Sequence, residues 1–276
     1  MTRNTYFQEL ARHSILVTTS AIMLFPLVWA VSISVKPPPE VFSAAFHLIP
    51  HDFHGIENYT QALTRVPMAR FLFNGALVCT AIFGLQVVVA LPCAYALAKL
   101  RFRGRDSLFA AVLVGLLIPP QVLAIPMFVM FYTVGILDSY SALVVPWTIS
   151  VFGIFLMRQF FRTVPDDLIH AARIDGLGEF AIVWRIMLPA AMPALIAFGT
   201  FSVVAHWNDL FWPLIAIQSE QYATPPLGLL HFRSDEAGSD YGPLMAGAVL
   251  ITAPLVLAFA FAQRWFIEGI TFTAIK

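Results

Sequence analysis

Long apolar runs restrict the fold of this sequence more than any other feature. A helix that crosses a membrane needs about 20 mostly apolar residues. Six runs meet or approach that length: 14–35, 71–98, 108–134, about 141–160, 193–217 and 243–266. Hydrophobic residues make up 59% of the chain and charged residues only 12%, against about 25% charged in soluble domains. The sequence therefore predicts an all-α integral membrane protein with six transmembrane helices.

The first run, 14–35, follows Arg3 and Arg12 as a signal peptide would. Its apolar core is longer than the roughly 7–15 residues of a signal peptide, and no convincing cleavage site follows it. We therefore expect an uncleaved transmembrane helix. Cys79 and Cys93 share one apolar run and would lie roughly 21 Å apart on a helix, too far for a disulfide.

The basic residues predict the orientation, because they are enriched in cytoplasmic loops. With six spans, the side that holds both termini carries 12 of the 16 lysines and arginines, and the other side carries Lys36, Arg65, Arg70 and Arg233. We therefore expect both termini in the cytoplasm. The segments 36–70 and 218–242 would then be extracytoplasmic loops, and neither is long enough for a separate domain.

His51, Asp52 and His54 lie close together in the outer loop 36–70. Two histidines in a turn-rich loop are weak evidence for a metal site, so a polar loop over the helix ends is favoured. No other set of residues has the spacing of a zinc site or of a catalytic triad, so no metal and no catalytic residues are predicted.

The segment 162–192, between the fourth and fifth runs, is too long for a tight turn. Pro165 and the two aspartates after it predict a helix start, and Gly176 and Gly178 predict its end. A second stretch has apolar residues at helical spacing, namely Phe180, Val183, Trp184 and Met187. The pattern predicts a cytoplasmic helix-turn-helix with one apolar side. A helix lying on the lipid surface would show the same pattern.

This segment also carries a motif. The run His170-Ala171-Ala172-Arg173-Ile174-Asp175-Gly176, nine residues, and then Ile186-Met187-Leu188-Pro189 resembles the cytoplasmic loop motif of binding-protein-dependent ABC importer permeases. The spacing matches, and His170 stands where the family usually has glutamate. The resemblance implies that 162–192 is the loop that couples the permease to its ATPase. The coupling residues that it implies are His170, Ala171, Ala172, Asp175, Gly176, Trp184, Ile186, Leu188 and Pro189.

Other stretches resemble the carbohydrate-type permeases, in particular the smaller permease of the maltose system. They are 94–98, 207–214, 263–266 and 269–271. The resemblance implies a type I importer permease fold with a core domain at 71–263, in a bacterial inner membrane. It also implies a second homologous permease, two ATP-binding cassette subunits and an extracytoplasmic solute-binding protein as partners, with membrane lipid around them.

ATP and Mg²⁺ are expected on the partner ATPases and not on this chain. No phosphate-binding loop is present, because none of the three lysines follows a glycine. The chain is accordingly not expected to be an enzyme or to bind a cofactor of its own. The balance of 16 basic and 16 acidic residues gives no reason to expect nucleic acid as a partner.

Asp209 is the only acid deep within an apparent span. An ionisable residue inside a membrane is a functional candidate, and carboxylate, amide and indole groups together suit a hydroxyl-rich solute. Prolines in the third span predict kinks that can line a cavity. The candidate pathway residues are Pro119, Pro120, Gln121, Trp207, Asn208 and Asp209. The alternative is that Asn208 and Asp209 cap or kink the helix near the interface.

The outer loop 218–242 has the composition of a flexible probe, and the resemblance implies that this segment reaches into the binding protein. Its candidate contact residues are Phe232, Arg233, Ser234, Asp235 and Glu236. A solvated connection is the alternative.

The predicted function is therefore a permease subunit of an ATP-driven importer for a sugar or sugar-like solute. A stand-alone secondary transporter or channel is the rival, but the spans hold no paired charges and no clear repeat. Glycerol phosphate or another polar solute is the alternative substrate. The absence of basic residues inside the spans favours a neutral one.

Overall fold

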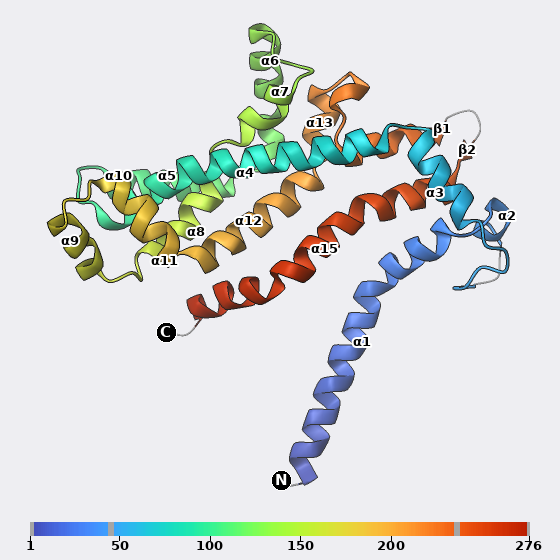
Figure 1. Cartoon of the computed structure of the whole chain (residues 1–276), viewed down its shortest axis with the longest axis horizontal. Helices are drawn as coiled ribbons and strands as arrows, with labels where there is room; N and C mark the ends of the chain where they lie inside the picture. The colour runs from blue at the N-terminus through green and yellow to red at the C-terminus, as the bar shows by residue number, and fades with distance from the viewer. Residues whose placement is uncertain (1–2, 44–46, 235–237, 275–276) are drawn as a thin grey trace. The chain divides into compact units, whose positions relative to one another are not determined.

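The structure is a computed structural model that describes residues 3–43, 47–234 and 238–274. The described part is almost entirely helical, with one short antiparallel ladder between β1 (Arg233–Ser234) and β2 (Gly238–Ser239) (Figure 1). The chain forms two compact units, Met1–Met68 with Leu229–Ala253 and Ala69–Gly228 with Pro254–Lys276.

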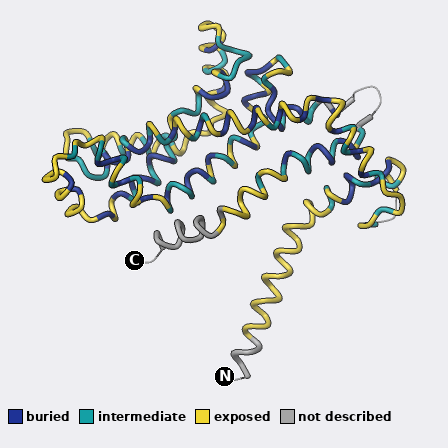
Figure 2. The backbone as a smooth tube through the Cα atoms, in the orientation of Figure 1, coloured by how far each residue is buried: buried dark blue, intermediate teal, exposed yellow. Residues whose placement is uncertain are grey.

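The first unit begins with α1, which has the length of a membrane span. Its elements are α1 (Arg3–Ser34), α2 (Pro38–Val41), α3 (Gly55–Thr64), η5 (Leu230–Phe232), the ladder and the start of α15 (Tyr241–Ala274). Residues 8–28 of α1 are exposed, as Figure 2 shows. Because this apolar surface has no cover from its own unit, lipid or a partner must cover it in the membrane.

The buried side-chain amide of Asn58 binds the backbone at the end of α1. Asn58, on α3, donates to the carbonyls of Ser34 at 3.0 Å and Lys36 at 2.9 Å. A Cβ added to Gly242 would lie 2.7 Å from the Asn58 amide, so glycine is required for α15 to approach α3 this closely. The part of the outer loop 36–70 around Asn58 is therefore packed against the end of α1, and the described positions of the loop hold no cluster of three or more metal-ligating residues.

The second unit is built around α4 (Met68–Lys99) and contains the remaining helices. They are α5 (Arg105–Leu117), η1 (Pro120–Leu123), α6 (Ala124–Val134), α7 (Tyr140–Val144), η2 (Val145–Trp147), α8 (Val151–Phe161), α9 (Asp166–Ile174), α10 (Glu179–Ile182), π-helical η3 (Val183–Met187), α11 (Leu188–Ala190), α12 (Met192–Trp207), α13 (Phe211–Ala216), η4 (Glu220–Tyr222) and α14 (Pro225–Leu229). Helix α8 packs against both α5 and α12. One core cluster joins α4 and α8 to the segment 162–192 through Leu91, Met157, Phe161, Ile182 and Met187, among others.

The expected spans 108–134 and 193–217 are broken, and the span of about 141–160 is bent by 41° between η2 and α8. The range 108–134 contains two helices, α5 and the η1–α6 segment, that meet at 93°. The cause is local, because Pro119 and Pro120 provide no backbone N–H and Pro119 takes an extended conformation. The range 193–217 is also interrupted, since α12 ends at Trp207 and α13 begins only at Phe211. Within 108–134 the prolines thus produce a sharp break and not a gentle kink.

The outer segment 218–242 is more ordered than its composition suggests. Residues Pro225, Leu227 and Gly228 of α14 are buried, and a Cβ on Gly228 would lie 2.2 Å from the Phe71 ring. The buried Asn74 of α4 also donates to the carbonyls of Gln221 and Ala223 at 3.0 and 2.9 Å. The first half of this segment is therefore packed onto α4.

Within the described residues, three helices are long and apolar enough to cross a membrane by themselves: Gln8–Ser34, Met68–Lys99 and Tyr241–Phe261. Three bent pairs of helices pass the same test when each is taken together, which gives up to six spans. The all-α integral membrane class is confirmed.

Candidate functional site

The segment 162–192 forms a short helix with a defined start and end. Helix α9 begins after Pro165 and carries Asp166 and Asp167 in its first turn, where carboxylates complement the helix dipole. At its end, Leu177 N–H donates to the Ala172 carbonyl and Gly176 N–H to the Arg173 carbonyl, both at 3.0 Å. This is a Schellman motif, in which Gly176 has φ +82°.

Two polar contacts attach α9 and α10 to α4. At the start of α9, the Lys99 ammonium donates to the Asp166 carboxylate at 2.5 Å and to the Val164 carbonyl at 2.6 Å. The hydrogen bond from Lys99 and its charge lower the pKa of Asp166.

The second contact is a triad at the start of α10. The Glu179 carboxylate accepts from the Arg173 guanidinium at 2.9 Å and from the Tyr95 hydroxyl at 2.5 Å. The Arg173 hydrogen bond is the largest cause of the lowered pKa of Glu179, and the Tyr95 bond adds to it. The same contact raises the pKa of Arg173. A charged group at each end of α9 thus connects this helix to the end of α4 that is predicted to be cytoplasmic. Figure 1 shows where α9, α10 and α4 lie.

The two faces of α9 differ. Ile169 and Ala172 are buried against the core, whereas His170 and Ala171 are exposed. Beside them, Leu168, Ile174 and Phe180 are 51%, 86% and 72% exposed. The helix thus has one face packed against the core and an exposed apolar surface on the other side. Such a surface suits contact with another protein.

The other motif residues lie at the end of α9 or in the segment that follows it. Asp175 caps it, and Trp184, Ile186 and Leu188 are half-buried against the same core cluster. Pro189, at the start of α11, is exposed. The structure therefore brings the whole motif into one substructure, in which His170 and Ala171 are exposed on α9 and Pro189 is exposed on α11.

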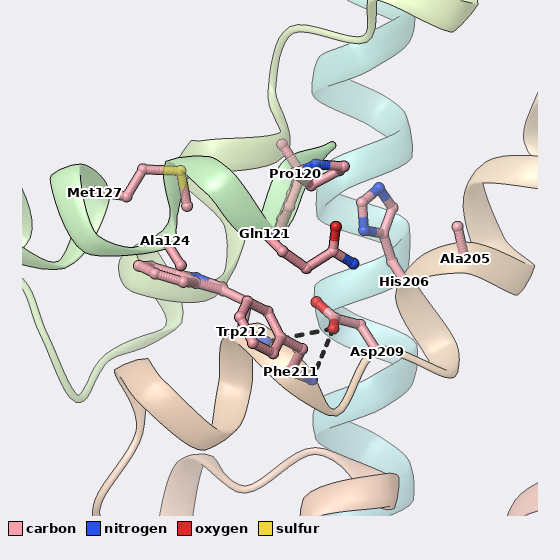
Figure 3. A pocket seen from close by; sticks show the side chains of 10 residues that line it. Pro120, Gln121, Ala124, Met127, Ala205, His206, Asp209, Phe211 and Trp212 are labelled. Atoms are coloured by element: carbon pink, nitrogen blue, oxygen red, sulfur yellow. Dashed lines mark hydrogen bonds between the residues drawn. The ribbon is translucent and has the colours of Figure 1, made fainter. Parts of the chain in front are cut away.

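A cavity lies where the two broken spans meet, as Figure 3 shows. Its volume is about 340 Å³. The described residues that line it are Pro120, Gln121, Ala124, Met127, Trp147, Ala205, His206, Asp209, Phe211 and Trp212. Three of the six candidate pathway residues, Pro120, Gln121 and Asp209, are therefore brought together.

The other three candidates do not line this cavity. Trp207 is buried, Asn208 donates to the Val204 carbonyl at 2.8 Å, and Pro119 lies at the break before η1. Asp209 contacts both the start of α13 and the cavity. Its Oδ1 accepts from the Phe211 and Trp212 amides at 3.0 and 3.4 Å, which caps α13, and its side chain also faces the cavity.

A polar cluster behind the cavity is absent from the sequence-based prediction. Gln86, on α4, is 3% exposed. It accepts from the Ser202 hydroxyl at 2.6 Å and donates to the Trp147 carbonyl at 2.9 Å. It also contacts His206 Nε2 at 3.3 Å. A glutamine in the middle of a span without charged residues was the available signal.

The candidate binding-protein residues are only partly described. Phe232 is 5% exposed, so its ring is not a contact surface in this conformation. Arg233 and Ser234 form β1. Asp235 and Glu236 lie outside the described residues.

Comparison with known proteins agrees with this architecture. Residues 86–271 match the model of a family described as "Binding-protein-dependent transport system inner membrane component". This chain belongs to that family. The match includes both broken spans and the whole motif of 162–192.

Two relatives cover nearly all of this permease. The arabinooligosaccharides transport system permease protein AraQ of Bacillus subtilis (strain 168) is 32% identical over 269 residues, covering 93% of this chain and 92% of AraQ. The sn-glycerol-3-phosphate transport system permease protein UgpE of Brucella abortus (strain 2308) is 29% identical over 273 residues, 96% of each chain.

Among solved structures, a bacterial ABC transporter involved in the import of the acidic polysaccharide alginate has the same fold. The TM-score is 0.83 at 22% identity, with 96% of this chain and 99% of the other covered. The type I importer permease fold is thus confirmed, and the protein is a permease subunit of an ABC importer. A second alginate transporter structure is described as a complex with a pentasaccharide-bound periplasmic protein, at a TM-score of 0.62 and 14% identity.

Proposed function

We propose that this permease carries a sugar or sugar-like solute across a bacterial inner membrane, that both of its termini are cytoplasmic, and that it forms half of the translocation pathway. The relatives named for arabinooligosaccharides and for diacetylchitobiose support the substrate class. The cavity supports it too, because its polar and aromatic side chains include no lysine or arginine among the described lining residues.

Loop 162–192 couples this permease to the ATPase. The observation that carries this role is the Schellman-capped helix α9, which is fixed to α4 by Lys99 and by the Arg173–Glu179–Tyr95 triad while its outer face is apolar and exposed. A helix held in this way moves as a rigid body with the spans behind it when its partner closes.

The partners are a second homologous permease, two ATP-binding cassette subunits and an extracytoplasmic solute-binding protein. ATP and Mg²⁺ are bound by the cassette subunits. Arg233, Ser234 and the two acidic residues after them contact the binding protein. Phe232 holds the base of that loop, because its ring lies near Gly247.

Reconstitution into proteoliposomes tests the function. The complete complex should take up a radiolabelled arabinooligosaccharide only with ATP inside and the binding protein outside. Uptake by this permease alone without ATP would instead indicate the rival stand-alone carrier.

Glycerol phosphate is the second candidate substrate, because UgpE covers 96% of the chain. The same vesicles, offered sn-glycerol-3-phosphate and the sugar separately, distinguish the two. Exclusive uptake of the phosphate ester would overturn the sugar assignment.

A further inference from the structure

The cavity at the two helix breaks has a polar wall that packing alone does not require. Gln86 lies on an apolar span and is nearly inaccessible, yet both ends of its amide have partners from other elements. Buried polar groups in a membrane are costly unless they are paired. The arrangement fixes the direction of every hydrogen bond around His206.

The direction follows from which atoms can only accept. The Trp147 carbonyl has no hydrogen to donate, so the group that lies 2.9 Å from it must be the Gln86 NH₂. The Gln86 oxygen then faces the Ser202 hydroxyl, which donates to it at 2.6 Å. The same NH₂ lies 3.3 Å from His206 Nε2, which must therefore accept. A neutral imidazole that accepts at Nε2 carries its proton on Nδ1.

Three polar groups thus face the cavity with complementary roles. His206 offers the Nδ1 hydrogen as a donor. The Gln121 amide makes no hydrogen bond to a described residue and offers both a donor and an acceptor. Asp209 uses Oδ1 for the cap of α13, which leaves Oδ2 to accept. Figure 3 shows these three side chains turned toward the same space.

Aromatic residues line the same cavity. Trp147 and Phe211 contribute apolar faces of the kind on which a sugar ring can stack, whereas Trp212 lines the cavity but is only 2% exposed. The volume of about 340 Å³ lies at the lower end of the range of small-ligand sites, about 300–1,000 Å³.

We propose that this cavity is a substrate-binding subsite within this chain, for one ring of a neutral polyhydroxylated solute. His206 Nδ1–H donates to a ring hydroxyl, Asp209 Oδ2 accepts from one, and Gln121 bonds a third. Gln86 is a positioning residue that fixes the His206 tautomer and does not contact the solute. This inference rests on the proposed function and deepens it.

The test uses the complete reconstituted complex and measures radiolabelled arabinotriose imported per ATP hydrolysed. The variants are Asp209→Asn, which keeps the capping oxygen, His206→Phe, and Gln121→Ala at an exposed position. Asn208→Ala is the matched control, because Asn208 is adjacent to Asp209 and outside the cavity lining. Loss of a hydrogen bond of this kind should lower sugar imported per ATP about tenfold for Asp209→Asn and for His206→Phe.

Stimulation of the ATPase by the sugar-loaded binding protein should stay within about twofold of wild type in these variants, and the control should behave as wild type. As a single variant, Gln86→Met should lower the amount of sugar imported per ATP. Combined with His206→Phe, it should cause no further loss, as expected of a residue that acts through His206.

An unchanged ratio in all three cavity variants would overturn the subsite. A parallel fall in ATPase stimulation and uptake in all three, Gln121→Ala included, would also overturn it by showing a structural role. If wild-type complex imports no sugar but imports sn-glycerol-3-phosphate, the proposed substrate class fails, and that result is read from wild type alone.

Discussion

Gly176 ends α9, the proposed coupling helix, in a conformation that other residues disfavour, so its replacement should weaken coupling without disturbing packing. Its φ is +82°, and a Cβ there would have no atom within 4 Å. The cost of a side chain is therefore backbone strain alone, about 1–2 kcal/mol. A cost of that size lowers the population of the capped turn about 5–30-fold. The strain energy should be about 2 kcal/mol for Gly176→Val. It should be near zero for Gly176→Asn, because asparagine adopts this conformation more readily.

Gly178 is the matched control. It lies in the same turn with equally open surroundings, but its φ of −73° suits any residue. We expect Gly178→Ala to keep wild-type ATPase stimulation by the binding protein in proteoliposomes. Gly176→Val should lose most of the stimulation and copurify with less ATPase. If the two variants stimulate alike, the left-handed turn has no part in coupling.

Three further predictions concern orientation, charge and packing. In a cysteine-free background, Ser107→Cys should react with a membrane-impermeant reagent only from inside and Glu220→Cys only from outside; the reverse would refute the proposed topology. Glu179→Gln should lower the melting temperature at pH 7 by an amount that corresponds to less than about 1 kcal/mol, because its ion pair with arginine is partly exposed. The native pKa of Glu179 lies below its ordinary value of about 4.5. The difference in melting temperature between the variant and wild type should therefore be present above pH 4.5 and vanish as the pH falls through the native pKa. A difference that persists in acid would contradict the ion-pair explanation. Gly153→Ala should cost about 1–3 kcal/mol, since the new methyl would lie 2.3 Å from a phenylalanine ring, whereas Gly84→Ala has open space and should be neutral or stabilising in thermal unfolding.

The sequence predicts the local structure of segment 162–192 better than it predicts the cavity. The start of α9 near Pro165 and its end near Gly176 follow from local chemistry, because capping and left-handed turns depend on a few adjacent residues. The apolar spacing after Gly178 likewise predicts helical structure. Its π-helical register does not follow from the spacing, since a period of 3.6 residues indicates an α-helix.

The cavity depends on contacts that are distant in sequence. Gln86 and His206 are 120 positions apart, and no local pattern joins them. The prolines at 119 and 120 indicate a bend, but composition does not give its angle of 93°. Similarly, the outer segment 218–242 has a loop-like composition, and only the Asn74 amide and the close approach of Gly228 to Phe71 explain why half of it is packed.

Helix α4 holds three separate parts of the unit through three polar side chains. Asn74 binds the outer segment, Gln86 sets the cavity wall, and Tyr95 bonds the coupling loop. Because each residue of a helix turns by about 100°, removing or adding one residue between any two of them would rotate one contact away from its partner. The sequence of α4 between these positions can vary, but its length cannot. Evolution within this span should therefore proceed by substitution and not by insertion or deletion.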